Sequence, residues 1–213
     1  MISSALLFLL LATAQPSQAG AQPFTKFTYC HESPNGPFEM LCIEFDASAV
    51  GAARFKRRDD DEIRSPITLS PGGKAQFLSV LSGTKYLEKA SSYESKKKVA
   101  DLGKKYLTLE MPSGRREAVF NYSEMKDVNA LVTFFEGLIV QEALVIDLVW
   151  AMQFDRLGVP ERLDQLENIL KQGRIVDPKS MLDVLGAVDR DEQIVNYARV
   201  HARDLSERIR AGK

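Results

Sequence analysis

The sequence is poor in the residues that most often carry chemistry: its 213 residues include two histidines, two cysteines and one tryptophan. It contains no G-x-S-x-G nucleophile motif and no G-x-G-x-x-G after a predicted strand, and "SPGGK" at 70–74 lacks the spacing of a phosphate loop. With histidine so scarce, general acid–base catalysis near neutral pH has few candidate residues. The motifs therefore predict no catalytic residue and no cofactor.

An excess of charge of one sign is also missing, because 28 basic residues face 29 acidic ones and the net charge is −1. Proteins that bind nucleic acid over a broad surface usually carry a marked cationic excess, so no nucleic-acid partner is predicted. The hydrophobic content of 45% is ordinary for a globular chain with one buried core or two small ones.

Lysine and arginine are absent before Lys26, although the first residues otherwise resemble an export signal. An apolar stretch at 5–12 is followed by Ser-Gln-Ala at 17–19, the small-x-small pattern of a signal-peptidase site. We therefore predict a signal peptide over 1–19 and a periplasmic or secreted bacterial protein. A cleavage site at 12–14, an uncleaved anchor and a misassigned start codon are the alternatives.

The most apolar run after this segment, "LVTFFEGLIVQEALVIDLVWAM" at 131–152, is long enough to cross a bilayer but contains three acids. An acid at mid-helix costs roughly 2.5–3.5 kcal/mol on insertion, whereas each Leu, Ile, Val or Phe returns only about 0.3–0.6 kcal/mol. We therefore predict a core helix and no transmembrane span, with a kink or break at Gly137. The acids Glu136, Glu142 and Asp147 are expected on an exposed edge; a buried carboxylate site is the alternative.

Two alternating stretches, "FTKFTYC" and "EMLCIEFD", predict strands joined by a turn rich in proline and glycine. Placing Cys30 opposite Cys42 puts the apolar residues on one face and pairs opposite charges on the other. In an exported protein this register predicts a disulfide between Cys30 and Cys42 on the solvent face. A redox-active pair, or a metal site completed by His31 and Glu32, are the alternatives.

A second hairpin is predicted from "KKYLTLEM-PSG-RREAVFNY". A three-residue loop would place Leu107 opposite Val119 and Tyr106 opposite Phe120.

Between the hairpins, "AARFKRR" predicts a third strand and "DDDE" a solvated loop. Ser70 and Pro71 favour a helix start, and Gly83 favours its end. Residues 24–140 are therefore predicted to form an α+β domain, an antiparallel sheet of about five strands in the order βββα-ββα packed on helices. A C-terminal helical region follows over 141–213, packed on or beside the sheet domain.

Three segments with helical periodicity make up this region, beginning near Val159, Asp177 and Asp191. On the last of them, His201 and Asp204 are three residues apart and could pair locally. A surface histidine without a special role is the favoured interpretation.

Basic residues concentrate in "RFKRRDDDE" at 54–62 and in the last helical segment. Such residues usually lie on exposed elements, where neighbouring acids or water compensate their charge. The alternative is docking of an acidic partner or an anionic surface. We carry forward as a candidate interaction surface Arg54, Lys56, Arg58, Arg199 and Arg203.

The order of strand, turn, strand, "LSPGGKAQFLSVLSGTKYLEK" and "LTLEMPSGRREAVFNY" resembles secreted bacterial domains of unknown function with β-hairpin and helix repeats. The resemblance covers residues 24–136 and rests on element order. Such domains often have a cysteine near the first turn, as Cys30 is here, but Cys42 falls later than the pattern implies. It transfers no activity and no site residue.

We therefore predict an exported, non-enzymatic binding or envelope-associated interaction module, with a protein as a candidate partner. The alternative is a small secreted hydrolase or enzyme inhibitor whose site is assembled from scattered residues. A deep polar cleft converging on His31 or His201 would favour an enzyme, and a flat apolar or charged face would favour binding.

Overall fold

The computed structural model describes residues 24–33, 38–58 and 61–212. The predicted signal peptide at 1–19, the turn at 34–37 and part of the acidic loop lie outside the described residues.

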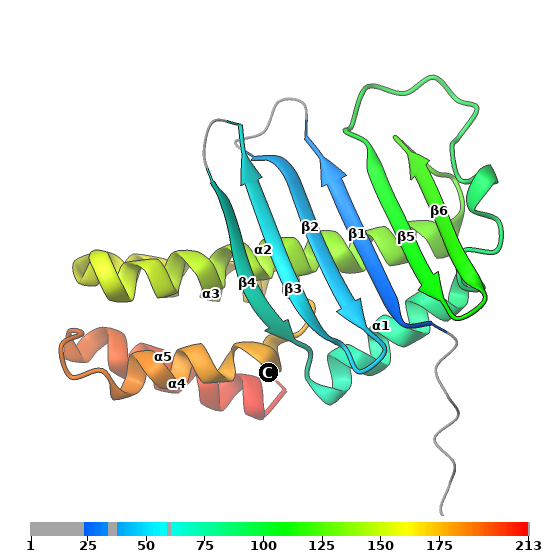
Figure 1. Ribbon diagram of the computed structural model, residues 1–213. Helices are drawn as coiled ribbons and strands as arrows, with labels where there is room; N and C mark the ends of the chain where they lie inside the picture. Colours follow the sequence, from blue (N-terminus) through cyan, green and yellow to red (C-terminus); the bar gives the residue numbers. More distant parts are fainter. Residues whose placement is uncertain (1–23, 34–37, 59–60, 213) are drawn as a thin grey trace, which may run out of the picture.

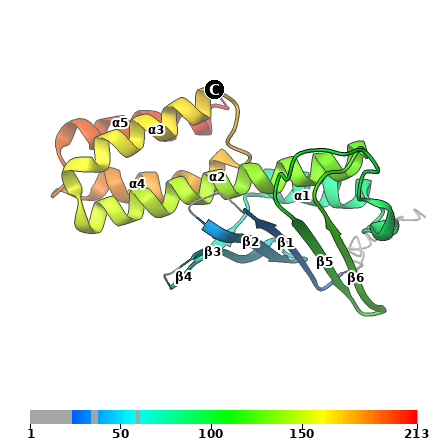
Figure 2. The same cartoon turned by 90° about the horizontal axis from the view of Figure 1, so that it is seen from above.

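A six-stranded antiparallel sheet and two long helices form the body of the molecule (Figure 1). The strands lie in the order β4-β3-β2-β1-β5-β6. Helices α1 and α2 cover one face of the sheet, and no described helix covers the other (Figure 2). The α+β class is confirmed, with one strand more than predicted. The elements are β1 (Lys26–Glu32), β2 (Phe38–Asp46), β3 (Val50–Arg57), β4 (Glu62–Thr68), α1 (Pro71–Gly83), β5 (Lys105–Met111), β6 (Gly114–Phe120) and α2 (Lys126–Phe154).

The pairing of β1 with β2 is the predicted one. Cys30 lies opposite Cys42, and the two form a disulfide on the face that the helices leave uncovered. Tyr29 and Ile43, opposite each other on the other face, are fully buried. Since both sulfur atoms are bonded to each other, neither is a thiolate, and the alternative metal site at these cysteines is wrong.

Replacing both cysteines with alanine is expected to lower the free energy of unfolding by about 2–3 kcal/mol, because the bridge restricts the unfolded chain. Urea denaturation measures this loss. Reduced wild-type protein should unfold near the same urea concentration as the variant. A variant as stable as the oxidised wild type would contradict a stabilising role.

The additional strand is β4. The sequence pattern predicts a solvated loop at its first residue and no defined element over the rest. Two features hide it in the sequence: Pro66 at its centre and the charged residues Glu62 and Arg64. Proline and exposed charges are tolerated on an edge strand, because one side of its backbone faces no neighbour. Ile67 still points into the core with 4% exposure.

The predicted register of the second hairpin is wrong by one residue. Met111 pairs with Gly114, so the turn has two residues where we expected three. Leu107 therefore lies opposite Ala118, and both side chains are buried. The slip turns Phe120 into the core and leaves Val119 55% exposed, because a shift of one residue exchanges the two faces of a strand.

Helix α2 is one unbroken helix of 29 residues, so the predicted break at Gly137 is wrong. This glycine instead permits close packing: a Cβ there would lie 2.2 Å from Cγ2 of Val176. Leu131, Phe135 and Leu138 of α2 are fully buried, as expected of a core helix. Within the described ranges, no helix combines the length and apolarity needed to cross a bilayer.

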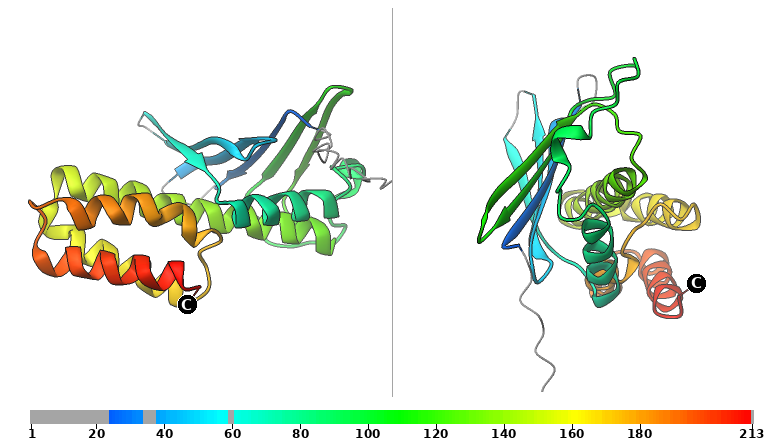
Figure 3. Two further views of the ribbon diagram at one scale, coloured as in Figure 1. Left: turned by 90° about the horizontal axis from the view of Figure 1, so that it is seen from below. Right: turned by 90° about the vertical axis from the view of Figure 1, so that its right-hand side faces the viewer.

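The C-terminal half of α2 extends past the edge strand β4 and packs with three further helices into a helical lobe (Figure 3). Its own buried cluster includes Leu148, Leu163 and Leu205. The division predicted at 140 and 141 falls inside α2, which contributes to both buried clusters. The lobe helices are α3 (Val159–Lys171), α4 (Leu182–Arg190) and α5 (Asn196–Arg210).

Candidate functional site

Two of the five predicted surface cations, Arg54 and Lys56, lie on the uncovered face of the sheet. Arg54 of β3 lies 3.9 Å from Glu44 and 3.8 Å from Glu62, so its charge is compensated. Lys56 follows on the same side of β3, two residues later, and Arg58 comes just after the strand. Lys26 and Arg64 also contact Glu44, so cations and acids alternate on this face.

The other two predicted cations lie on α5, in the helical lobe, so the structure does not bring the five together. The Arg203 guanidinium donates to both carboxylate oxygens of Asp189 on α4, at 2.8 and 3.4 Å. Within the described chain, Nε of Arg199 is buried and has no hydrogen-bond partner. Arg203 therefore links α5 to α4.

His31 lies at the end of β1, where the sheet meets α2. Its Nε2 is 3.1 Å from the carbonyl oxygen of Leu102, and its Nδ1 is 4.0 Å from Oε1 of Glu136. The Tyr29 hydroxyl donates to the same oxygen at 3.4 Å. Burial, with the Glu136 carboxylate nearby, raises the pKa of Tyr29. Among the described residues, these contacts join His31 and Tyr29 to Glu136 and include no serine, threonine or cysteine side chain.

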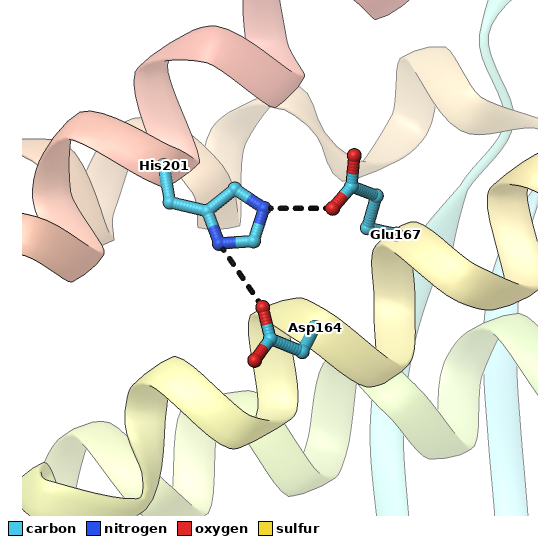
Figure 4. A group of neighbouring side chains, drawn as sticks. All are labelled: Asp164, Glu167 and His201. Carbon is cyan, nitrogen blue, oxygen red and sulfur yellow. Dashed lines mark ion pairs between the residues drawn. The ribbon is translucent and has the colours of Figure 1, made fainter.

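His201 does not pair with Asp204; it faces two acids of α3 (Figure 4). Its Nδ1 is 3.6 Å from Oδ1 of Asp164, and its Nε2 is 3.3 Å from Oε2 of Glu167. The acid at 167 also accepts from Arg208 and Lys171, and these hydrogen bonds lower its pKa to about 2. Sequence spacing could not reveal this cluster, because it joins α3 to α5.

A buried polar network, also missed from the sequence, links the sheet domain to the helical lobe. The Asp177 carboxylate accepts from the backbone N–H and the hydroxyl of Ser70, at 2.7 and 2.6 Å. The Asp177 backbone N–H donates to the side-chain oxygen of Gln141 at 2.9 Å. Gln141 donates in turn to the Ser180 hydroxyl at 2.8 Å. The N-terminus of α1 is thus joined to α2 and the connector before α4.

The network explains the "SPGGK" stretch. A Cβ at Gly73 would lie 2.4 Å from Oδ2 of Asp177, so glycine is needed for the approach of this carboxylate. Ser70 caps α1, its hydroxyl accepting from the Gly73 N–H at 3.2 Å, as predicted. The carboxylate of Asp177 lies at the N-terminus of α1, the position that a bound phosphate would take if "SPGGK" were a phosphate loop.

Glu142 lies beside this network and is only 5% exposed, so its predicted place on an exposed edge is wrong. Burial raises its pKa to about 7, and the Asp177 carboxylate adds to the rise. Its carboxylate accepts a long hydrogen bond from the Gln141 amide, at 3.4 Å. The sequence held one signal: at 100° per residue, Glu142 falls off the stripe shared by Glu136 and Asp147.

A cavity of about 550 Å³ lies where α1, the connector before α4 and the end of α5 meet. Neither histidine lines it. Its lining combines apolar side chains with three cations and one acid. The side chains that define its character are Leu170, Ile175, Val176, Ile209, Lys171, Lys179, Arg208 and Asp177.

An apolar patch marks the far end of the helical lobe. Trp150, the only tryptophan, is 52% exposed, and its ring contacts that of Phe154, which is 70% exposed. Leu157 follows at 83%. Exposed large apolar groups gathered in one place are typical of interaction surfaces.

No protein-family model and no curated protein sequence matches this chain. Its function must therefore be inferred from the arrangement of its own residues.

Proposed function

We propose that this chain is an exported, non-enzymatic binding module that takes a small amphipathic anion in the cavity between the sheet domain and the lobe. The cavity of about 550 Å³ carries this proposal. Ligand sites are commonly apolar hollows of roughly 300–1,000 Å³ between packed units, with a few polar groups that orient the ligand.

The charges lining the cavity favour an anionic group. Lys171, Lys179 and Arg208 line the cavity together with one acid, Asp177, whose carboxylate is already engaged by Ser70. Lys171 and Arg208 also contact Glu167, which does not line the cavity, so part of their charge is compensated. The apolar side chains of the floor suit a hydrocarbon or aromatic portion. The disulfide supports the extracytoplasmic location, because such bonds persist in oxidising compartments.

The probe for this proposal is 1-anilinonaphthalene-8-sulfonate, an apolar ring system with one anionic group, added to the full chain. We expect saturable binding at one site, at least tenfold weaker in Gly72→Leu. Gly72 lines the cavity, and a Cβ there meets only the Ser70 hydroxyl, at 3.7 Å, so a larger side chain can begin here without a backbone clash and add bulk to the cavity. Fluorescence titration measures the affinity.

Three comparisons make the test specific. Ala75→Leu adds the same side chain to an exposed position of α1 outside the cavity and should bind as wild type does. Trp150→Ser removes apolar surface at the lobe end and should also bind normally. Lys171→Gln with Lys179→Gln should weaken the sulfonate probe but not its neutral analogue, N-phenyl-1-naphthylamine. Equal binding by Gly72→Leu and wild type would overturn the proposal.

The hydrolase alternative predicts a different result: turnover of a chromogenic ester that His31→Gln or His201→Gln abolishes. The cavity is lined by neither histidine, and this favours binding over catalysis.

A protein partner is a second candidate, favoured by the patch of Trp150, Phe154 and Leu157. Replacing Phe154 and Leu157 with serine should release the chain from the envelope fraction if this patch docks it there. Val119→Ser, at an exposed apolar residue of the edge strand β6, is the matched control. Retention of both variants would rule out docking by the patch.

A further inference from the structure

The geometry points to a divalent transition-metal site formed by Asp164, Glu167 and His201, separate from the ligand cavity. One ligand atom from each of these side chains lies within 4.8 Å of both others. The three residues come from two helices that pack against each other, so their backbones are held in place without a metal (Figure 4).

The spacing between Glu167 and His201 suits metal ligation. Two ligands bound at about 2.0–2.2 Å to one tetrahedral ion are separated by roughly 3.3–3.6 Å. An imidazole gives one nitrogen to an ion, and Nε2 of His201 lies 3.3 Å from Oε2 of Glu167. Asp164 contacts the other ring nitrogen, Nδ1, at 3.6 Å, so its exposed side chain must turn toward Nε2 to bind the same ion.

The neighbouring cations complete the site and do not occupy it. Arg208 and Lys171 both contact Oε1 of Glu167, whereas Oε2 faces the histidine. Carboxylates that bind metals are usually held by such outer partners, which fix their orientation. The oxygen that faces His201 therefore stays available to an ion.

The ligand types select the class of ion. One imidazole nitrogen with two carboxylate oxygens suits zinc and similar divalent transition ions better than magnesium, which prefers oxygen alone. Glu167 and His201 are 20% and 13% exposed, so the inner part of the site is sheltered. Asp164, at 56%, lies at its rim, where an ion can enter and water can complete the coordination.

The test uses the full, untagged chain after chelation, titrated with zinc chloride by calorimetry. We expect one zinc ion per chain, and at least tenfold weaker binding in His201→Gln and in Asp164→Asn. His201 is largely buried, and its replacement could disturb the fold. Asp164→Asn changes an exposed side chain, so it tests the site in a chain that still folds. Asp204→Asn is the matched control. It changes an exposed acid three residues after His201 on α5, and it should bind zinc as wild type does.

The chain has two histidines, so NMR can assign the site directly. Zinc should shift the imidazole signals of His201 and leave those of His31 in place, while magnesium at the same concentration should shift neither. Absence of zinc binding, or a response at His31 alone, would show that the cluster is an ion-pair network joining α3 to α5 and would overturn the proposal.

Discussion

Glu142→Gln is expected to stabilise the protein at pH 8 by about 3 kcal/mol and to change its stability little at pH 4. The side chain is 5% exposed, and burial raises its pKa from 4.5 to about 7. Each unit of pKa difference between the folded and unfolded states corresponds to about 1.4 kcal/mol. Glutamine keeps the shape of the protonated acid and cannot ionise.

The sign follows from which state binds the proton. Between about pH 4.5 and 7 the folded protein keeps the Glu142 proton while the unfolded chain has lost it. The free energy of unfolding therefore falls as the pH rises through this range and levels off above the folded-state pKa. Glu142→Gln should lack this part of the fall.

Urea denaturation at several pH values between 4 and 8 measures the difference. Asp147→Asn, which changes an exposed acid on the same helix, is the matched control. If wild type and Glu142→Gln showed parallel stability curves across this range, the buried carboxylate would not be the source of the pH dependence.

Phe135→Ala is expected to lower the free energy of unfolding by about 3–5 kcal/mol, because it removes a fully buried ring and leaves a cavity. The ring stands at the centre of the aromatic core, between sheet and helices. Its centroid lies 5.0 Å from that of Phe27, 5.3 Å from Tyr29 and 5.8 Å from Phe77. Such aromatic contacts add to the effect of burial.

Phe154→Ala is the comparison, since it removes the same atoms from a position on the same helix that is 70% exposed. Its unfolding free energy should stay within about 0.5 kcal/mol of wild type. Both are measured by urea denaturation of the full chain. Similar losses at the two positions would mean that α2 is not buried against the sheet in the way described.

The two hairpins show what local pattern can and cannot predict. In the first, charge pairing, apolar alternation and the cysteines all favour one register, and the structure has it. In the second, "AVF" places apolar residues next to each other, so alternation does not choose a face. The length of the turn then decides the register, and Gly114 joins the strand with a φ of 132°.

The candidate sites were beyond prediction for a different reason. Ser70, Gln141 and Asp177 lie far apart in the chain and meet only because α1, α2 and the connector before α4 converge. His201 and Glu167 likewise meet through helix packing. No spacing in the sequence records either meeting.

By itself, the sequence determined the α+β class, the first hairpin with its disulfide, the capped start of α1 and the role of the 131–152 run as a core helix. Each of these features depends on residues that are close together in the chain, through helix capping, turn residues or the alternation of apolar and polar side chains. Only the tertiary structure decided the edge strand, the register of the second hairpin, the burial of Glu142 and the composition of both proposed sites. These depend on which segments approach one another, and that is set by packing of the whole core.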